Sequence, residues 1–183
     1  SGPVYIVTGF PVNGTFETDG PVGAFGLYRL CEKMGHQPVI ITDNFIVGAL
    51  QDRFVCKSIA GKTFETVSRH AEALYREAPP GLVISIERPG MAADGRYYNM
   101  SGEDITANCG IAEPYLVFAP CPTIAIGDGG NEIGMGNVLS GLSQFDIRPA
   151  ISTCTELIVA DVSNWGAYAL CSLTTWLSGD PLA

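Results

Sequence analysis

Carboxylate and amide side chains recur beside glycines in several loops of the sequence, and residues 127–136 form the most informative of these loops. The glycines let the backbone adopt positive φ angles and approach a ligand closely. Asp128, Asn131 and Glu132 carry oxygen atoms, which hard cations such as Mg²⁺ and Mn²⁺ prefer as ligands. Asx residues also favour turns, because their side chains hydrogen-bond to their own backbone. Alone, this segment indicates either a cation site or a tight turn.

Three further loops of similar composition follow predicted strands, at residues 9–20, 87–100 and 161–166. In open α/β sheets, ligands bind beyond the carboxyl ends of the strands. We therefore expect the four loops to meet at one edge of the sheet. One loop of this kind carries little weight, but four at a common edge predict a site built from carboxylates, amides and backbone N–H groups.

Short β-rich runs alternate with helical patterns along the chain. Strands are predicted at residues 4–7, 38–41, 54–59, 82–86, 123–126 and 157–160, and helices at residues 21–34, 64–78 and 163–177. This alternation implies right-handed crossovers and a three-layer α/β sandwich, with a mostly parallel sheet and helices on both faces. No linker or repeat divides the pattern, so residues 1–183 are expected to form a single domain.

The first predicted helix has clear end signals. Pro21 suits its first turn, where a missing N–H costs nothing, and Gly35 suits the position that ends it. Asp19 has two readings, because an Asp before a helix often caps it and this Asp also lies in one of the four loops. The sequence leaves both readings open.

The composition excludes several classes of protein. Lys and Arg total 10 against 19 Asp and Glu, a formal charge of -9 that disfavours nucleic acid and anionic membranes as partners. No apolar run approaches the roughly 18–20 residues that span a bilayer, and no signal peptide is expected. A small metabolite, bound together with a cation, is more compatible with this negative charge.

The six cysteines contain no CxxC pair, and we expect free thiols.

Other familiar site types are poorly supported. His36 and His70 are the only histidines, which disfavours a catalytic triad or a histidine-rich metal site. The glycines of residues 127–136 lack dinucleotide-binding spacing, because Glu132 stands where the third glycine would fall. Residues 56–63 are not a phosphate-binding loop, because Cys56 replaces its leading glycine. The acidic loops remain the best candidate.

Four motifs, in the right order, resemble those of the D-glutamate cyclase family in its C-terminal domain type. They are ETDGP at residues 17–21, ERPG and AADGRYYNM at 87–100, GDGGNEIGMG at 127–136, and VSNWG with YAL at 162–170. Ser101 occupies a place where the family often has a basic residue. Family members usually continue beyond the VSNWG helix, so a C-terminal extension is expected to be missing from this chain.

The resemblance implies a lactam-forming hydro-lyase that closes D-glutamate to 5-oxo-D-proline with the help of a divalent cation, Mn²⁺. Asp128 and Glu132 are then expected to hold the metal, and the expected catalytic residues are Asp19, Asp94 and Glu87, with Asp94 or Asp19 as the base for the amine. The expected substrate contacts are the guanidinium of Arg88 or Arg96, the N–H groups of Gly129 and Gly130, and the side chains of Glu17, Tyr97, Asn99, Asn131 and Asn164. The resemblance also implies a mitochondrial matrix location in animals or a cytoplasmic one in bacteria, and is compatible with a homo-oligomer.

Two other functions stay open on the sequence alone. Glycines before predicted helices, at Gly20 and at Gly129-Gly130, could bind the phosphate of a nucleotide, although the loops hold few lysines. A non-catalytic regulatory domain of the same fold would carry the same motifs.

Overall fold

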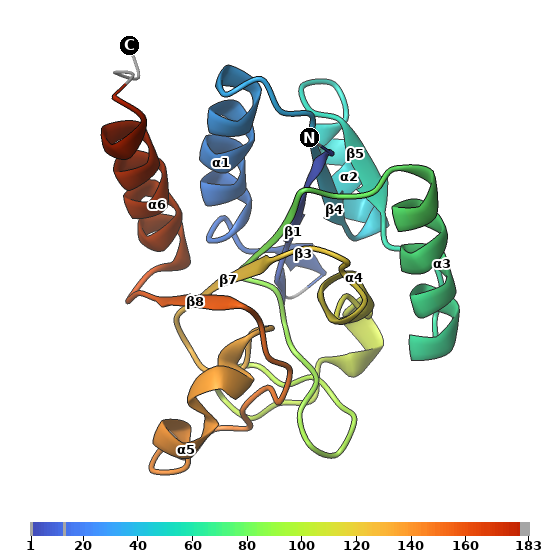
Figure 1. Cartoon of the computed structure of the whole chain (residues 1–183). Helices are drawn as coiled ribbons and strands as arrows, with labels where there is room; N and C mark the ends of the chain where they lie inside the picture. Colours follow the sequence, from blue (N-terminus) through green and yellow to red (C-terminus); the bar gives the residue numbers. More distant parts are fainter. Residues whose placement is uncertain (1, 13, 180–183) are drawn as a thin grey trace.

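The computed structural model describes residues 2–12 and 14–179. Its centre is a sheet (Figure 1), which has six strands. The strands lie in the order β5-β4-β1-β6-β7-β8, and every neighbouring pair is parallel. Their bounds are Val4–Thr8 (β1), Pro38–Thr42 (β4), Cys56–Ser58 (β5), Leu82–Ile86 (β6), Thr123–Gly127 (β7) and Glu156–Val159 (β8). All six predicted strands are confirmed.

The three predicted helices are also present, together with shorter elements that the sequence did not reveal. The long helices are Pro21–Lys33 (α1), Phe64–Glu77 (α3) and Ser163–Ser178 (α6). The short additions are a hairpin of Pro11–Val12 (β2) and Thr15–Phe16 (β3), the helices Asn44–Leu50 (α2), Pro114–Val117 (α4) and Leu139–Leu142 (α5), and the 3₁₀ turns Thr106–Asn108 (η1) and Met135–Val138 (η2).

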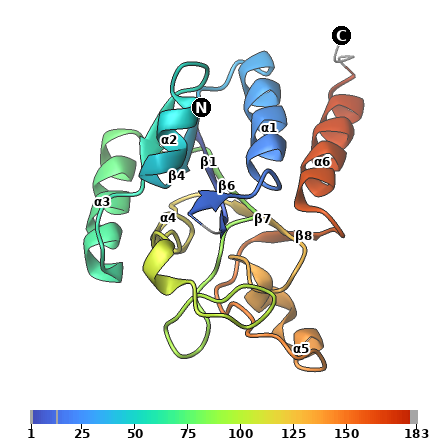
Figure 2. The ribbon, with the colours of Figure 1, turned by 180° about the vertical axis from the view of Figure 1, so that it is seen from behind.

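Helices cover both faces of the sheet, as the alternation of side chains along each strand requires. In β1, Val4 and Ile6 pack into one apolar cluster with α1 and α6, whereas Tyr5 and Val7 pack into a second cluster with α3 and α4. Helices α1 and α6 lie side by side in both views (Figures 1 and 2) and make extensive contact. The predicted three-layer α/β sandwich is therefore confirmed.

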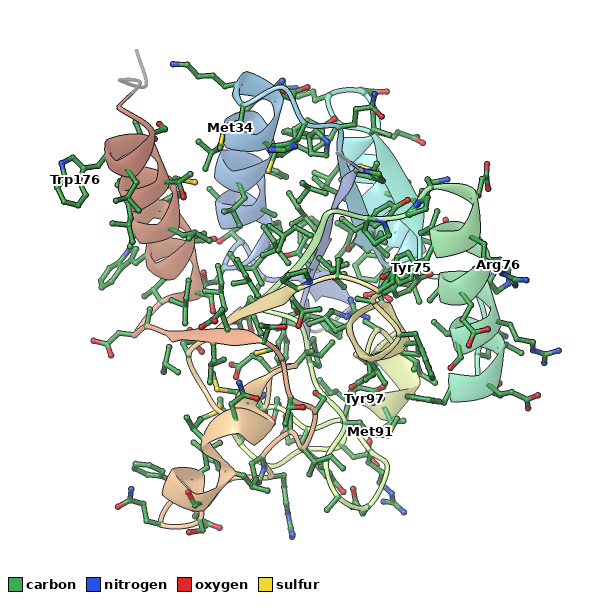
Figure 3. The ribbon with its side chains drawn as sticks, viewed as in Figure 1. Met34, Tyr75, Arg76, Met91, Tyr97 and Trp176 are labelled. Atoms are coloured by element: carbon green, nitrogen blue, oxygen red, sulfur yellow. The ribbon has the colours of Figure 1, made fainter. Side chains whose placement is uncertain are left out.

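Helix α3 shows how a single helix separates core from solvent. Tyr75 points toward the sheet and is 5% exposed, while the next residue, Arg76, points into solvent (Figure 3). Helix α6 also exposes an apolar side chain to solvent, since Trp176 projects away from the body of the domain (Figure 3).

Among the helices of the described residues, none combines the length and apolarity needed to cross a membrane. All six cysteines, which lie in the described part of the chain, are free thiols as expected.

The strand order places a reversal between β1 and β6. From β1 the chain moves outward to β4 and β5, and then returns to β6 and continues to β7 and β8. At such a switch point the loops leaving the two central strands turn in opposite directions, so a crevice opens beyond their carboxyl ends. The loops that follow β1, β6 and β7 surround this crevice.

Candidate functional site

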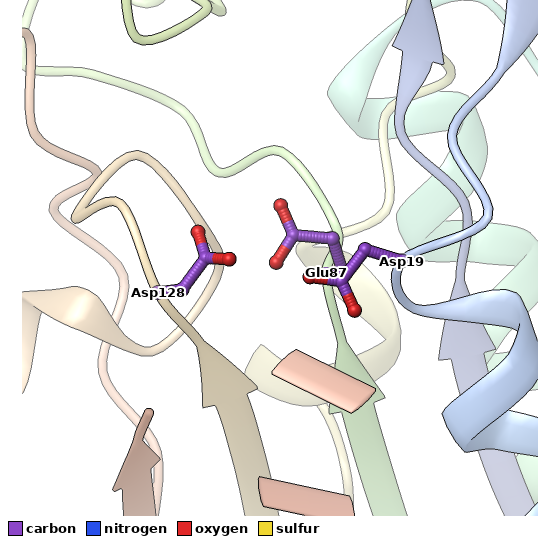
Figure 4. A group of neighbouring side chains, drawn as sticks. All are labelled: Asp19, Glu87 and Asp128. Carbon is purple, nitrogen blue, oxygen red and sulfur yellow. The ribbon is translucent and has the colours of Figure 1, made fainter. Parts of the chain in front are cut away.

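Three carboxylates meet at the switch point. The side chains of Asp19, Glu87 and Asp128 bring one oxygen each to within 4.8 Å of one another (Figure 4). They lie on the loops after β1, β6 and β7, so segments far apart in the sequence form one acidic cluster. All three residues were predicted members of the site, and the loops meet at one edge of the sheet as expected.

The backbone at Glu87 adopts a conformation that is unusual for a residue with a side chain. Among the described residues other than glycine, only Glu87 has a φ in the left-handed region, at 43°. This conformation costs free energy and is typical of functional sites. The neighbouring Gly20 has a φ of 89°, and a Cβ there would lie 2.6 Å from the Cβ of Glu87. Because Gly20 has no Cβ, the side chain of Glu87 can pack directly against its backbone.

The N-terminal backbone N–H groups of α1 and α6 are each bonded by a side chain from the other segment. Ser163 and Asn164, at the start of α6, donate their backbone N–H groups to the carboxylate of Asp19 at 3.0 and 2.7 Å. In return, Oδ1 of Asn164 accepts the N–H groups of Gly20 and Gly23 at the start of α1, at 3.0 and 2.6 Å. The reading of Asp19 as cap of its own helix is wrong, because the cap position of α1 is Gly20. Asn164 therefore positions backbone and holds α1 and α6 together.

Ser163 is a member of the site that the sequence did not identify as such. Its hydroxyl is fully buried and donates a hydrogen bond to Oε2 of Glu87 at 2.5 Å. The start of α6 therefore contacts both Asp19 and Glu87. The only signal in the sequence was its place in the VSNWG motif, which does not reveal where the hydroxyl points.

The cluster is electrostatically unfavourable without a cation. Burial raises the pKa of Glu87 above its ordinary range, and the nearby charges of Glu132 and Asp128 raise it further. Burial also raises the pKa of Asp128, and the charges of Glu132 and Asp19 add to the effect. Closely spaced carboxylate oxygens that resist ionisation together are a good match for a divalent cation, which neutralises them. Their all-oxygen donor set therefore fits Mn²⁺ or Mg²⁺.

Glu132, the other predicted metal ligand, is not one of the three clustered carboxylates and has hydrogen-bond partners in its own loop. It is buried, and its two carboxylate oxygens accept the backbone N–H groups of Gly129 and Gly130 at 2.8 Å each. Its carboxylate thus braces the loop that carries Asp128. The N–H groups of Gly129 and Gly130, which were predicted to contact the substrate, donate to Glu132 instead.

Neither predicted arginine clamp lies in the acidic crevice. Arg88 is fully buried, forms an ion pair with Asp43 and donates to the carbonyl oxygens of Gly9, at 2.8 Å, and Gly110. Arg96 is exposed and pairs with Asp104 at 3.4 Å. Each guanidinium is directed to a protein partner, so the predicted contact with a substrate carboxylate does not follow from the structure.

Asp94 and Tyr97 also lie outside the cluster. The exposed carboxylate of Asp94 accepts the hydroxyl of Tyr98 at 2.6 Å and the backbone N–H of Arg96 at 3.2 Å, and these bonds keep its pKa below the usual range. Tyr97 is buried and donates to Oε2 of Glu113 at 2.6 Å. The backbone N–H of Met91, which is labelled with Tyr97 in Figure 3, donates to the other carboxylate oxygen of Glu113. Both residues stabilise the long loop after β6, and the structure does not support Asp94 as the base for the amine.

A cavity of about 260 Å³ adjoins the cluster. Its lining residues are Phe10, Pro11, Val12, Glu17, Glu87, Asn99, Met100, Ser101, Asp128 and Asn131. Three of the predicted substrate contacts, Glu17, Asn99 and Asn131, are therefore brought to the cavity. A larger cavity of about 380 Å³ lies between α1, α6 and the sheet, but its walls are mostly apolar and lie away from the cluster.

The three predicted substrate contacts that line the cavity differ in their freedom to bind a ligand. Asn131 is buried and donates to the carbonyl of Tyr98 at 2.8 Å, while its Oδ1 has no hydrogen-bond partner among the described residues. A buried acceptor without a partner is costly, so a ligand N–H would stabilise it. The amide of Asn99 is engaged within its own loop with Glu103. Burial, and then the charges of Asp19 and Glu132, raise the pKa of Glu17.

Two comparisons with known proteins identify relatives of this chain. A family model described as D-glutamate cyclase-like, C-terminal, matches residues 1–182. The human protein named D-glutamate cyclase, mitochondrial, is 31% identical over 198 residues, which cover 93% of this chain and 32% of the human protein. The chain thus spans about a third of the length of that relative. With the family model matching nearly the whole chain, the chain belongs to the family of D-glutamate cyclase-like C-terminal domains.

Proposed function

We propose that this domain closes D-glutamate to 5-oxo-D-proline with loss of water, assisted by a divalent cation, Mn²⁺. The observation that carries the proposal is the cluster of Asp19, Glu87 and Asp128 at the switch point of the sheet, in a chain of this family. The human relative is named D-glutamate cyclase, mitochondrial, and we extend both its activity and its compartment to this chain as parts of the same proposal.

The three carboxylates of the cluster would hold the cation. When bound, a divalent cation neutralises the γ-carboxylate of the substrate and polarises its C–O bond. Asp19 is fixed by backbone N–H groups of α6 and Glu87 by the hydroxyl of Ser163, so two of the three ligands are oriented before the cation binds. Such preorganisation favours binding, because little side-chain freedom remains to be lost.

The base for the amine is better assigned to Glu17 than to Asp94. Glu17 lines the cavity, whereas Asp94 is held on the outer loop by Tyr98. The raised pKa makes Glu17 a stronger base than an ordinary carboxylate, which suits a group that takes a proton from the α-ammonium. Oδ1 of Asn131 would accept an N–H of the same amine and direct its lone pair toward the γ-carbon. Holding amine and carboxyl groups together removes much of the entropic part of the barrier.

The decisive experiment is incubation of the purified domain with D-glutamate and Mn²⁺, followed by mass spectrometry for 5-oxoproline. We expect product from D-glutamate, and its loss when the cation is chelated. L-glutamate is the matched control for stereospecificity. If D-glutamate protects the protein against thermal unfolding but no product forms, the domain is a binding module and the proposed activity is wrong.

A nucleotide-binding function is less compatible with the site, although the strand order is that of dinucleotide-binding domains. Three carboxylates stand at the switch point where a pyrophosphate would lie, and they would repel it. Thermal-shift measurements with nucleotides, set beside D-glutamate plus Mn²⁺, separate the two functions.

Stabilisation of the domain by Mn²⁺ is expected to grow with pH. Because the folded-state pKa values of Glu87 and Asp128 lie above their unfolded values, these groups favour folding at acidic pH, and that contribution is lost as pH rises through the raised values. The cation must displace their protons at low pH, whereas at higher pH it relieves their repulsion. The increase in Tm caused by Mn²⁺ should therefore be larger at about pH 7.5 than at about pH 5.5. Equal shifts at both pH values would contradict the assignment of these carboxylates as ligands.

A further inference from the structure

A second cavity lies against the acidic one. It has a volume of about 330 Å³ and shares Met100 and Asp128 with the acidic cavity as a common wall. Its character is different, because its other walls are mainly apolar side chains, among them Leu142, Phe145 and Val159. Its volume is within the range in which proteins bind small molecules. One face of the Asp128 loop thus meets carboxylates and amides, and the other meets an apolar space.

The glycines of the Asp128 loop bring the apolar cavity close to the site. A Cβ at Gly130 would lie 2.8 Å from Cδ1 of Ile147 and 3.0 Å from Cδ2 of Leu142. A Cβ at Gly129 would lie 2.5 Å from the sulfur of Met100. Because neither glycine has a side chain, these apolar groups pack directly on the loop that carries Asp128. A substrate whose γ-carbonyl lies at Asp128 would need only a short extension past Met100 to reach them.

The charge of the acidic cavity favours a neutral acyl group over an anionic one. Glu17, Glu87 and Asp128 line it, and no Lys or Arg side chain of the described residues does. A γ-carboxylate brings a negative charge that the cation must neutralise and is a poor electrophile, whereas a γ-amide is neutral and carries its own leaving group. The apolar cavity then offers a place for the substituent on the amide nitrogen.

We propose that the site also cyclises γ-D-glutamyl amides of apolar amines, with the amine portion of the substrate in the apolar cavity. This inference rests on the proposed D-glutamate cyclase activity. The neutral α-amine forms a bond to the γ-carbon, and the bond from that carbon to the leaving nitrogen breaks. One hydrogen of the α-amine is transferred to the leaving nitrogen through a cavity carboxylate. The products are 5-oxo-D-proline and the free amine, and water is neither consumed nor released.

The test uses γ-D-glutamyl-p-nitroanilide with Mn²⁺, alongside D-glutamate in a parallel assay. We expect p-nitroaniline, followed by absorbance, and 5-oxo-D-proline, followed by mass spectrometry, in equal amounts above a blank without protein. If D-glutamate is cyclised and the anilide is not, the inference is overturned and the proposed function stands. If neither substrate reacts, both are overturned.

A matched pair of variants assigns the amine portion to the apolar cavity. Val159 and Val55 are each 57% exposed, but Val159 lines the cavity on β8, whereas Val55 lies beside β5 at the opposite edge of the sheet. Val159→Asp should lower the ratio of kcat/KM for the anilide over that for D-glutamate by about tenfold, because a charge replaces apolar contact. Val55→Asp should leave the ratio unchanged. Circular dichroism checks the fold, and Phe145→Asp, also in the cavity wall, replaces Val159→Asp if that variant does not fold. An unchanged ratio in a folded cavity variant would overturn the inference.

Discussion

Asp128→Asn is expected to abolish Mn²⁺ binding at the acidic cluster and to lower kcat for 5-oxo-D-proline formation by about a hundredfold or more. Asp128 supplies one of three oxygens that lie within 4.8 Å of one another, and an amide keeps the shape of the side chain but loses its charge. The side chain is on an exposed loop residue, so the fold should survive the change. Isothermal titration with Mn²⁺ and product analysis by mass spectrometry measure the two effects independently.

The matched control is Asp94→Asn, which makes the same chemical change on the loop after β6. The carboxylate of Asp94 is exposed and bonded to Tyr98, outside the cluster and the cavity. Mn²⁺ affinity and kcat should therefore stay near their original values. The reverse pattern, with activity lost in Asp94→Asn and kept in Asp128→Asn, would show that the cluster is not the catalytic centre.

The sheet and the long helices were predictable because their signals are local. Buried parallel strands such as β6 appear as short apolar runs bounded by turn residues, and α1 begins at a proline and is followed by a glycine. The seven residues of α2 are too few to show a helical period, and α4 and α5, with four residues each, are shorter still. Their positions depend on tertiary packing, which a short window of sequence does not contain.

The location of the site was predictable, whereas the direction of each side chain was not. The rule that ligands bind beyond the carboxyl ends of strands placed Asp19, Glu87 and Asp128 together. It could not show that Glu132 turns back to the N–H groups of its own loop, because those bonds depend on the turn at Gly129 and Gly130. Membership of a motif that resembles the family's therefore did not distinguish a carboxylate of the cluster from one that braces its own loop.

Arg88 illustrates the same difficulty, since it directly follows Glu87 and yet its side chain is buried in an ion pair away from the acidic cluster. Its partner Asp43 comes directly after β4, at the same edge of the sheet. The sequence thus contained both partners, but the pair is separated by 45 residues and only the parallel arrangement of β4, β1 and β6 brings them together.

Arg88→Met is expected to lower the free energy of unfolding by about 3–5 kcal/mol, because the change leaves the buried carboxylate of Asp43 without its charged partner. Arg88 has no exposed surface, and the carbonyl oxygens of Gly9 and Gly110 would lose a donor as well. Urea denaturation followed by circular dichroism measures the loss. Adding Asp43→Asn should recover part of it, since the second change removes the unpaired charge.

Arg96→Met provides the contrast, because its ion pair with Asp104 is solvent-exposed and contributes little to stability. Its denaturation midpoint should match that of the original chain, and a loss as large as that of Arg88→Met would contradict the structural role given to the buried pair.

Arg88 joins the segments that contain Gly9, Asp43 and Gly110 directly beside Glu87. Because it fixes the backbone from which the Glu87 carboxylate projects, folded Arg88→Met should also bind Mn²⁺ more weakly. Asp128→Asn should lose Mn²⁺ without losing stability, and this difference separates the residue that holds the loops from the one that holds the cation.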